Sequence, residues 1–134
     1  MREIEFRARA KNKKCWVIGD LVHDGTGYSI IEKKGGCIRV KPETIGQYVG
    51  LCDKNHKEIY EGDIVKIYCE SYTEQWKAVG IVEYIRGGFG VSYENKKHFL
   101  HFCDMSMYVR GYEVIGNIYD NPELLGGSDE ECDN

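Results

Sequence analysis

The chain has 134 residues, enough for one compact domain or two small ones. A chain of this length can bury a sizeable hydrophobic core without disulfides or structural metals. Its net charge of −4, from 18 basic and 22 acidic residues, argues against a protein whose whole surface binds nucleic-acid phosphates. No apolar run reaches the roughly 18 residues of a membrane span. The charged N-terminus has no apolar core of a signal peptide, so we expect a cytoplasmic protein.

The first half of the chain has the pattern of short strands joined by hairpin turns. Charged and apolar residues alternate from Glu3 to Ala10, which predicts a strand with one solvent-exposed face and one buried face. Lys33-Lys34-Gly35-Gly36 predicts a turn between two further strands. Pro42 predicts a brief helical turn at 42–44. The expected strands of this half cover residues 3–10, 15–18, 28–31, 37–40 and 47–51.

The second half is predicted to be β throughout. Five short strands between about residues 59 and 119 suggest a small closed barrel, and Glu61-Gly62-Asp63-Ile64-Val65 is common at the opening of SH3-like barrels. Asn121 and Pro122 predict one helical turn near the end. The five expected strands cover residues 64–69, 77–85, 89–93, 98–102 and 112–119, and a short extended segment at residues 58–60 precedes them.

These elements predict a mainly β protein with at most short helical turns. An N-terminal β-hairpin region, residues 1–58, is expected to pack on an SH3/Tudor-like barrel, residues 59–126. Residues 127–134 form an acidic tail that we expect to be disordered, since it has almost no apolar anchor.

Three segments of the chain resemble the YopX family. They are the opening Met1-Arg2-Glu3-Ile4-Glu5-Phe6-Arg7-Ala8, the stretch from Thr44 to Val65, and the ending from Val114 to Leu125. The resemblance implies a phage or prophage protein in a bacterial host, with a Tudor- or SH3-like barrel and no established molecular function. His56 stands where the family usually has Gly, which leaves the tightness of this turn open.

The cysteines and histidines do not form a recognisable metal or catalytic motif. Six cysteines are spread along the chain without close pairs: Cys15, Cys37, Cys52, Cys69, Cys103 and Cys132. In a cytosolic protein we expect free thiols, with Cys37 and Cys69 acting as small hydrophobes. His98 and His101 would face opposite sides of a strand, so no metal site is predicted. Asp53-Lys54-Asn55 is interpreted as a turn, because the further acidic ligands of a calcium loop are absent.

Aromatic residues of the predicted barrel are the remaining candidates for a binding site. SH3-like barrels bind peptides, methylated side chains or nucleic acid through aromatic groups near their loops. Two lysines that follow these aromatics could add a phosphate contact. The alternative is that most of these rings belong to the core or to ordinary surface. The candidate ligand-binding residues are Tyr72, Trp76, Tyr84, Phe89, Tyr93, Lys96 and Lys97.

The leading hypothesis is therefore a non-enzymatic binding or adaptor module with an unknown protein partner. The first alternative is a nucleic-acid-binding protein that acts through the barrel. The second is a self-associating structural protein, since strand edges need pairing or cover. We expect no cofactor, no metal and no membrane partner, and no enzymatic activity.

Overall fold

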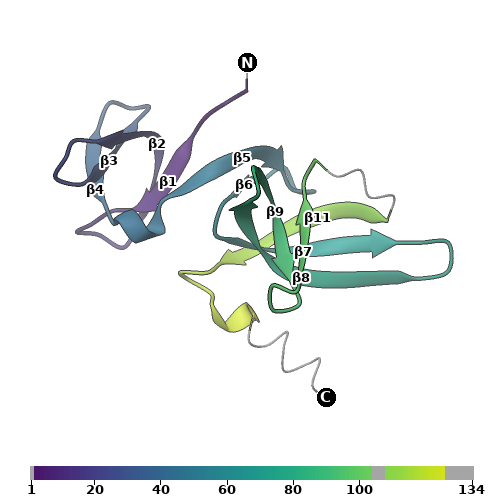
Figure 1. The fold of residues 1–134 in the computed structure, drawn as a ribbon. Helices are drawn as coiled ribbons and strands as arrows, with labels where there is room; N and C mark the ends of the chain where they lie inside the picture. Colours follow the sequence, from purple (N-terminus) through teal and green to yellow (C-terminus); the bar gives the residue numbers. More distant parts are fainter. Residues whose placement is uncertain (1, 104–107, 126–134) are drawn as a thin grey trace. The chain divides into compact units, whose positions relative to one another are not determined.

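The computed structural model describes residues 2–103 and 108–125. Its contacts divide the chain into two compact units, residues 1–50 and 51–134, whereas the sequence suggested a boundary after residue 58. Each unit is described by itself (Figure 1). The acidic segment 127–134 and Cys132 lie outside the described residues.

The first unit is an antiparallel sheet with the strand order β4-β3-β2-β1-β5. Each expected strand is present, because alternating apolar residues place one face of each strand on a core. β1 is shorter than the expected range 3–10, and β2 continues to His23, beyond the expected end at residue 18. A 3₁₀ turn at Pro42–Thr44, also predicted, precedes β5. The strands are β1 (Phe6–Arg9), β2 (Trp16–His23), β3 (Tyr28–Glu32), β4 (Cys37–Val40) and β5 (Gly46–Cys52), the last of which runs into the second unit.

Four residues from four successive strands form the core of the first unit. Ala8, Val17, Ile30 and Val40 are each at most 4% exposed. The neighbouring residues of β1 and β2 point to the opposite face, which carries Arg7, Trp16 and other partly exposed side chains. The sheet therefore has one packed face and one accessible face.

The second unit holds β6 and a five-stranded antiparallel sheet of order β10-β9-β8-β7-β11. Apolar residues fill its centre, and Ile64, Val65 and Val91 are fully buried. The strands are β6 (Glu58–Tyr60), β7 (Asp63–Glu70), β8 (Gln75–Ile85), β9 (Gly88–Tyr93), β10 (His98–His101) and β11 (Val109–Asn117).

This sheet is curled, but it does not close. β10 and β11 stand at its two ends, and within the described residues no ladder joins them. Instead, the ring of Phe102, just after β10, meets the ring of Tyr112 on β11 at a centroid distance of 5.0 Å. Aromatic side chains thus bridge the gap where a barrel would have backbone hydrogen bonds. The mainly β prediction is confirmed, and the closed barrel is corrected to an open, curled sheet.

Asp53 and His56 shape the turn between β5 and β6. Asp53 accepts hydrogen bonds from the backbone N–H groups of Asn55 and Lys57, at 2.8 and 2.9 Å, as an aspartate turn does. His56 adopts a φ of 66°, the left-handed conformation that favours glycine. The turn is therefore a longer hairpin loop with a left-handed residue, rather than a two-residue turn.

No helix in the part of the chain that the structure describes is long and apolar enough to cross a membrane.

Candidate functional site

The predicted binding residues fall in three places on the second unit. Tyr72 and Trp76 lie at the β7–β8 turn, and Tyr84 and Phe89 lie at the β8–β9 turn, where their rings meet edge to face at 5.0 Å. The remaining residues, Tyr93, Lys96 and Lys97, lie at the β9–β10 turn. The seven residues therefore do not form one continuous site.

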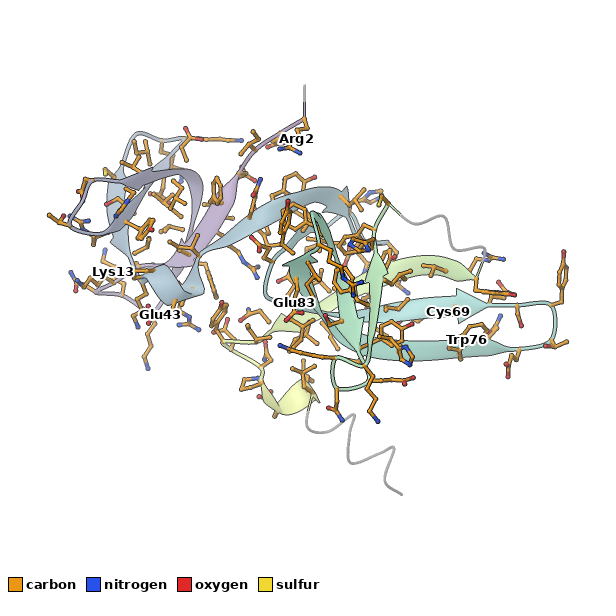
Figure 2. The ribbon with its side chains drawn as sticks, viewed as in Figure 1. Arg2, Lys13, Glu43, Cys69, Trp76 and Glu83 are labelled. Atoms are coloured by element: carbon orange, nitrogen blue, oxygen red, sulfur yellow. The ribbon has the colours of Figure 1, made fainter. Side chains whose placement is uncertain are left out.

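A groove of about 460 Å³ runs along the end of the β7–β8 hairpin. Trp76 is 40% exposed there, and Tyr72 at the tip of the turn is fully exposed. Figure 2 shows Trp76 and Cys69 on the neighbouring strands of this hairpin, where the register pairs them. The residues that line this hairpin groove are Tyr68, Cys69, Glu70, Gln75, Trp76, Lys77 and Arg110.

Tyr108 lies outside the residues that line the hairpin groove but contacts one of them, Trp76. Its ring lies 5.9 Å from that of Trp76, and it is 46% exposed. The carbonyl of Tyr108 accepts a hydrogen bond of 2.7 Å from the N–H of Glu70, which fixes its backbone against β7. Tyr108 was not predicted as a site residue, because residues 103–111 show no strand pattern that would place it beside Trp76.

Tyr68 is held firmly at the wall of the groove. Its hydroxyl donates to Glu113 at 2.5 Å, and the ammonium groups of Lys54 and Lys77 lie 4.1 and 5.4 Å from its ring centre. The hydrogen bond to Glu113 raises the pKa of Tyr68, with burial and the charge of Glu113 acting in the same direction. Tyr68 is therefore a neutral, oriented ring at working pH.

Charges of both signs rim the hairpin groove. Glu70 lies 3.5 Å from Nε of Arg110, and Nε2 of Gln75 donates to it at 3.1 Å. Lys77 adds a second cation. A mixed rim around exposed rings is typical of protein-binding surfaces, in which aromatic anchors supply most of the affinity.

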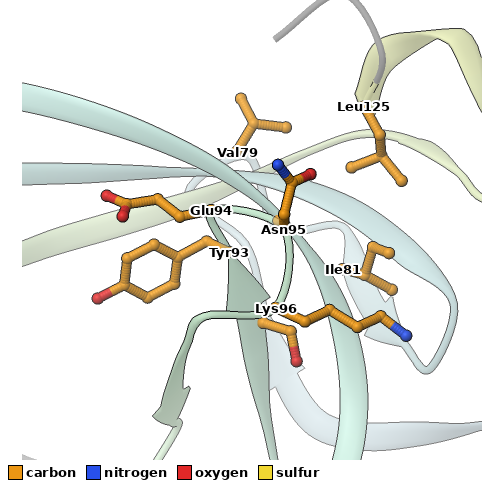
Figure 3. Close-up of a pocket in the computed structure, with 9 residues that line it drawn as sticks. Val79, Ile81, Tyr93, Glu94, Asn95, Lys96 and Leu125 are labelled. Atoms are coloured by element: carbon orange, nitrogen blue, oxygen red, sulfur yellow. The ribbon is translucent and has the colours of Figure 1, made fainter. Parts of the chain in front are cut away.

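A second, smaller pocket of about 280 Å³ lies beside the β9–β10 turn (Figure 3). Val79, Ile81 and Leu125 give it an apolar side, and three successive turn residues, 94–96, have positive φ. Lys96 is paired with Glu83 at 3.1 Å. Lys96, one of the two lysines predicted to contact phosphate, therefore already has a carboxylate partner within the unit.

Cys69, His98 and His101 are the cysteine and histidines on the strands of the second unit's five-stranded sheet. Burial raises the pKa of the Cys69 thiol, so the nucleophilic thiolate is disfavoured. His98 pairs with Glu94 at 3.2 Å, and a ring nitrogen of His101 lies 2.9 Å from the carbonyl oxygen of Ile85. Cys15, Cys37, Cys69 and Cys103 are free, as expected, but Cys37 is exposed rather than packed as a small hydrophobe.

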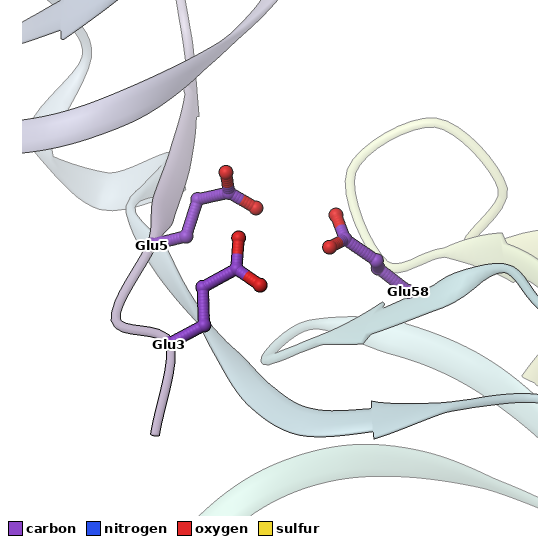
Figure 4. Close-up of side chains that lie close together, drawn as sticks. All are labelled: Glu3, Glu5 and Glu58. Atoms are coloured by element: carbon purple, nitrogen blue, oxygen red, sulfur yellow. The ribbon is translucent and has the colours of Figure 1, made fainter. Parts of the chain in front are cut away.

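Two carboxylates precede β1 in the first unit. Glu3 and Glu5 point to the same side of an extended segment (Figure 4), and the ammonium of Lys33 lies 3.8 and 3.5 Å from them. Glu58, drawn with them, opens β6 in the second unit. Lys33 thus neutralises the acidic start of the first unit.

Comparisons with known proteins identify the family. The family model described as YopX protein matches residues 5–126. Among solved structures, the crystal structure of protein EF1440 from Enterococcus faecalis is similar, with 30% sequence identity and a TM-score of 0.60. The match covers 93% of this chain and 99% of the other. Curated proteins give no match. The chain belongs to the YopX family.

Proposed function

We propose that this YopX protein is a non-enzymatic binding module that holds a segment of a partner protein in the hairpin groove. The observation that carries the proposal is the exposed Trp76–Tyr108 pair, of which Trp76 lines a groove with a mixed charged rim. Large aromatic side chains at the centre of a surface are the usual anchors of protein–protein binding. The curled sheet serves as an SH3-like platform, and the bacterial cytosol is the proposed place of action.

The charge of the second unit indicates the partner's chemistry. Residues 51–134 contain 8 basic and 16 acidic residues, a net charge of −8. Even without the four acids of residues 129–133, the remainder is negative. Such a surface attracts basic protein segments and repels phosphate backbones. We therefore favour a basic peptide segment with an apolar anchor over nucleic acid as the occupant of this unit.

An array of short synthetic peptides tests the proposal. The full chain should bind peptides that carry an apolar residue beside Lys or Arg, and Trp76→Ala should abolish this binding because it removes the anchor ring. Tyr84→Ala is the matched control, since Tyr84 is an exposed ring on the same strand, outside the groove lining. Equal loss of binding in both variants, or no peptide preference at all, would contradict the proposal.

A further inference from the structure

Charge is divided unequally between the two units. Residues 1–50 contain 10 basic and 6 acidic residues, a net charge of +4, although the whole chain is at −4. An opposite charge balance in two parts of one chain points to different partners for the two parts. The first unit thus has the sign of charge that suits a polyanion.

The accessible face of the first unit carries two arginines over a tryptophan. The guanidinium carbons of Arg7 and Arg9 lie 4.9 and 5.3 Å from the ring centre of Trp16. The register pairs Arg9 with Trp16 and Arg7 with Ile18, so these four side chains share one face of β1 and β2. Cation–π contacts of this kind hold the ring in place.

Lysines extend this face at one end of the sheet. Lys11, Lys13 and Lys14 are exposed in the β1–β2 turn, where Figure 2 shows Lys13. Two backbone hydrogen bonds of 2.9 Å, from Lys11 to Arg39 and from Lys41 to Arg9, bring Lys41 beside this turn. We define the basic aromatic surface as Arg7, Arg9, Lys11, Lys13, Lys14, Trp16 and Lys41.

Several carboxylates of the first unit are already paired with other cations. Asp24 lies 3.3 Å from Arg39, and hydrogen bonds from Thr26 and Arg39 hold the pKa of Asp24 well below its ordinary value. Glu3 and Glu5 are paired with Lys33. None of these carboxylates lies in the β1–β2 turn, so the lysines of that turn dominate the charge there.

Apolar side chains continue the surface along the sheet. Ile18 is 42% exposed on the face of Trp16, and Ile31, which shares that face through the pairing of Asp20 with Ile31, is 40% exposed. Asp20, also exposed, places a carboxylate on this face, farther along β2 from the lysines of the β1–β2 turn. A row of exposed ring and aliphatic side chains beside cations suits unpaired bases next to phosphates. A duplex offers its phosphates but keeps its bases stacked inside, so it would leave this row unused.

We propose that the basic aromatic surface binds single-stranded nucleic acid, with a base stacked on Trp16 and phosphates held by the lysines of the β1–β2 turn. This function goes beyond peptide binding in the hairpin groove and uses none of its residues. The protein would then hold a nucleic-acid strand with one unit and a protein segment with the other.

Fluorescence anisotropy with a labelled oligothymidylate tests the proposal on the full chain. Lys13→Ala combined with Lys14→Ala should weaken binding at low salt on the order of tenfold or more. It should also lower the slope of log K against log salt by roughly 1.4, since each single-strand phosphate contact contributes about 0.7. The exposed pair Lys34→Ala and Lys57→Ala is the matched control for charge. It should leave the slope unchanged.

Trp16 provides a second readout that is specific to stacking. In a Trp76→Phe background, Trp16 is the sole tryptophan, and oligothymidylate should quench its fluorescence. No binding at low salt, an equal effect of both lysine pairs, or tighter binding of duplex would overturn the proposal. Equal binding of anionic lipid vesicles with no quenching of Trp16 would also overturn it, by identifying a general polyanion surface.

Discussion

Replacing Asp53 should uncouple the β5–β6 turn from β11. Its side chain is only 6% exposed, and Oδ1 accepts the two turn hydrogen bonds from Asn55 and Lys57. Oδ2 accepts a third, at 2.9 Å, from the N–H of Val114 on β11. One carboxylate therefore satisfies three backbone donors and joins segments 61 residues apart in sequence.

The expected loss follows from the donors left unpaired. A buried donor without a partner costs about 1–3 kcal/mol. Because Asn55 and Lys57 are exposed and water can reach their N–H groups, Asp53→Ala should destabilise the second unit by about 2–3 kcal/mol. Asp53→Asn keeps the shape and one acceptor oxygen and should cost about 1–2 kcal/mol. Glu74→Gln, at an exposed position in the β7–β8 turn, removes a carboxylate without such bonds to the rest of the unit and should change stability by less than about 0.5 kcal/mol.

The lowered pKa of Asp53 predicts how the stability difference between wild type and Asp53→Asn changes with pH. Burial alone raises the pKa of Asp53, but the bonds from Val114, Lys57 and Asn55 lower it on balance below its ordinary value. A lowered pKa in the folded state contributes stability above the unfolded value of about 3.9, and this contribution disappears as pH falls through the folded pKa. The stability gap between wild type and Asp53→Asn should therefore narrow only below about pH 4.

Urea unfolding in a Trp16→Phe background measures this gap, because Trp76 then reports on the second unit alone. A loss below about 0.5 kcal/mol for Asp53→Ala would refute the assigned role of the carboxylate. A gap for Asp53→Asn that stays constant far into acid would refute the electrostatic part of the reasoning.

Three further substitutions have expected effects on unfolding in urea. His56→Gly should stabilise the protein by about 0.5–1 kcal/mol, because glycine adopts the φ of 66° without strain; a loss would contradict this. Gly80→Ala should cost about 2 kcal/mol, since its Cβ would lie 2.3 Å from the carbonyl oxygen of Ser92. Gly36→Ala, near only a flexible side chain, is the control and should stay near zero. Thr44→Val should cost about 1–2 kcal/mol by removing two hydroxyl hydrogen bonds to backbone; no change would count against this.

The alternation of residue types made the strands predictable. Glu3 to Ala10 identified β1, and the glycine-rich turns located the hairpins that follow. Closure of the sheet was not predictable in this way, because it depends on how far the strands twist and curl. The pattern could not show that Phe102 and Tyr112 would meet as rings where a ladder was expected.

The candidate sites depend on pairing register, which composition does not reveal. Tyr84, Phe89 and Tyr93 were correctly placed on strands near turns, whereas Trp76 lies on β8 because this strand begins two residues before the expected range 77–85. These four rings are divided among three turns. Tyr108 reaches Trp76 only through the return of β11. The positive net charge of the first unit can be counted from the sequence once the unit boundary is known. The net charge of the whole chain does not reveal it, because the acidic second unit offsets it.

Site-directed photo-crosslinking in bacterial cells tests the central claim, partner binding in the hairpin groove, most directly. Tyr72→p-benzoylphenylalanine places the reactive group at the fully exposed tip of the β7–β8 turn, and the same replacement of Tyr84 is the control. We expect discrete protein adducts from position 72 that disappear with Trp76→Ala, and none from position 84. No adducts from position 72, or adducts that persist in Trp76→Ala, would contradict the claim.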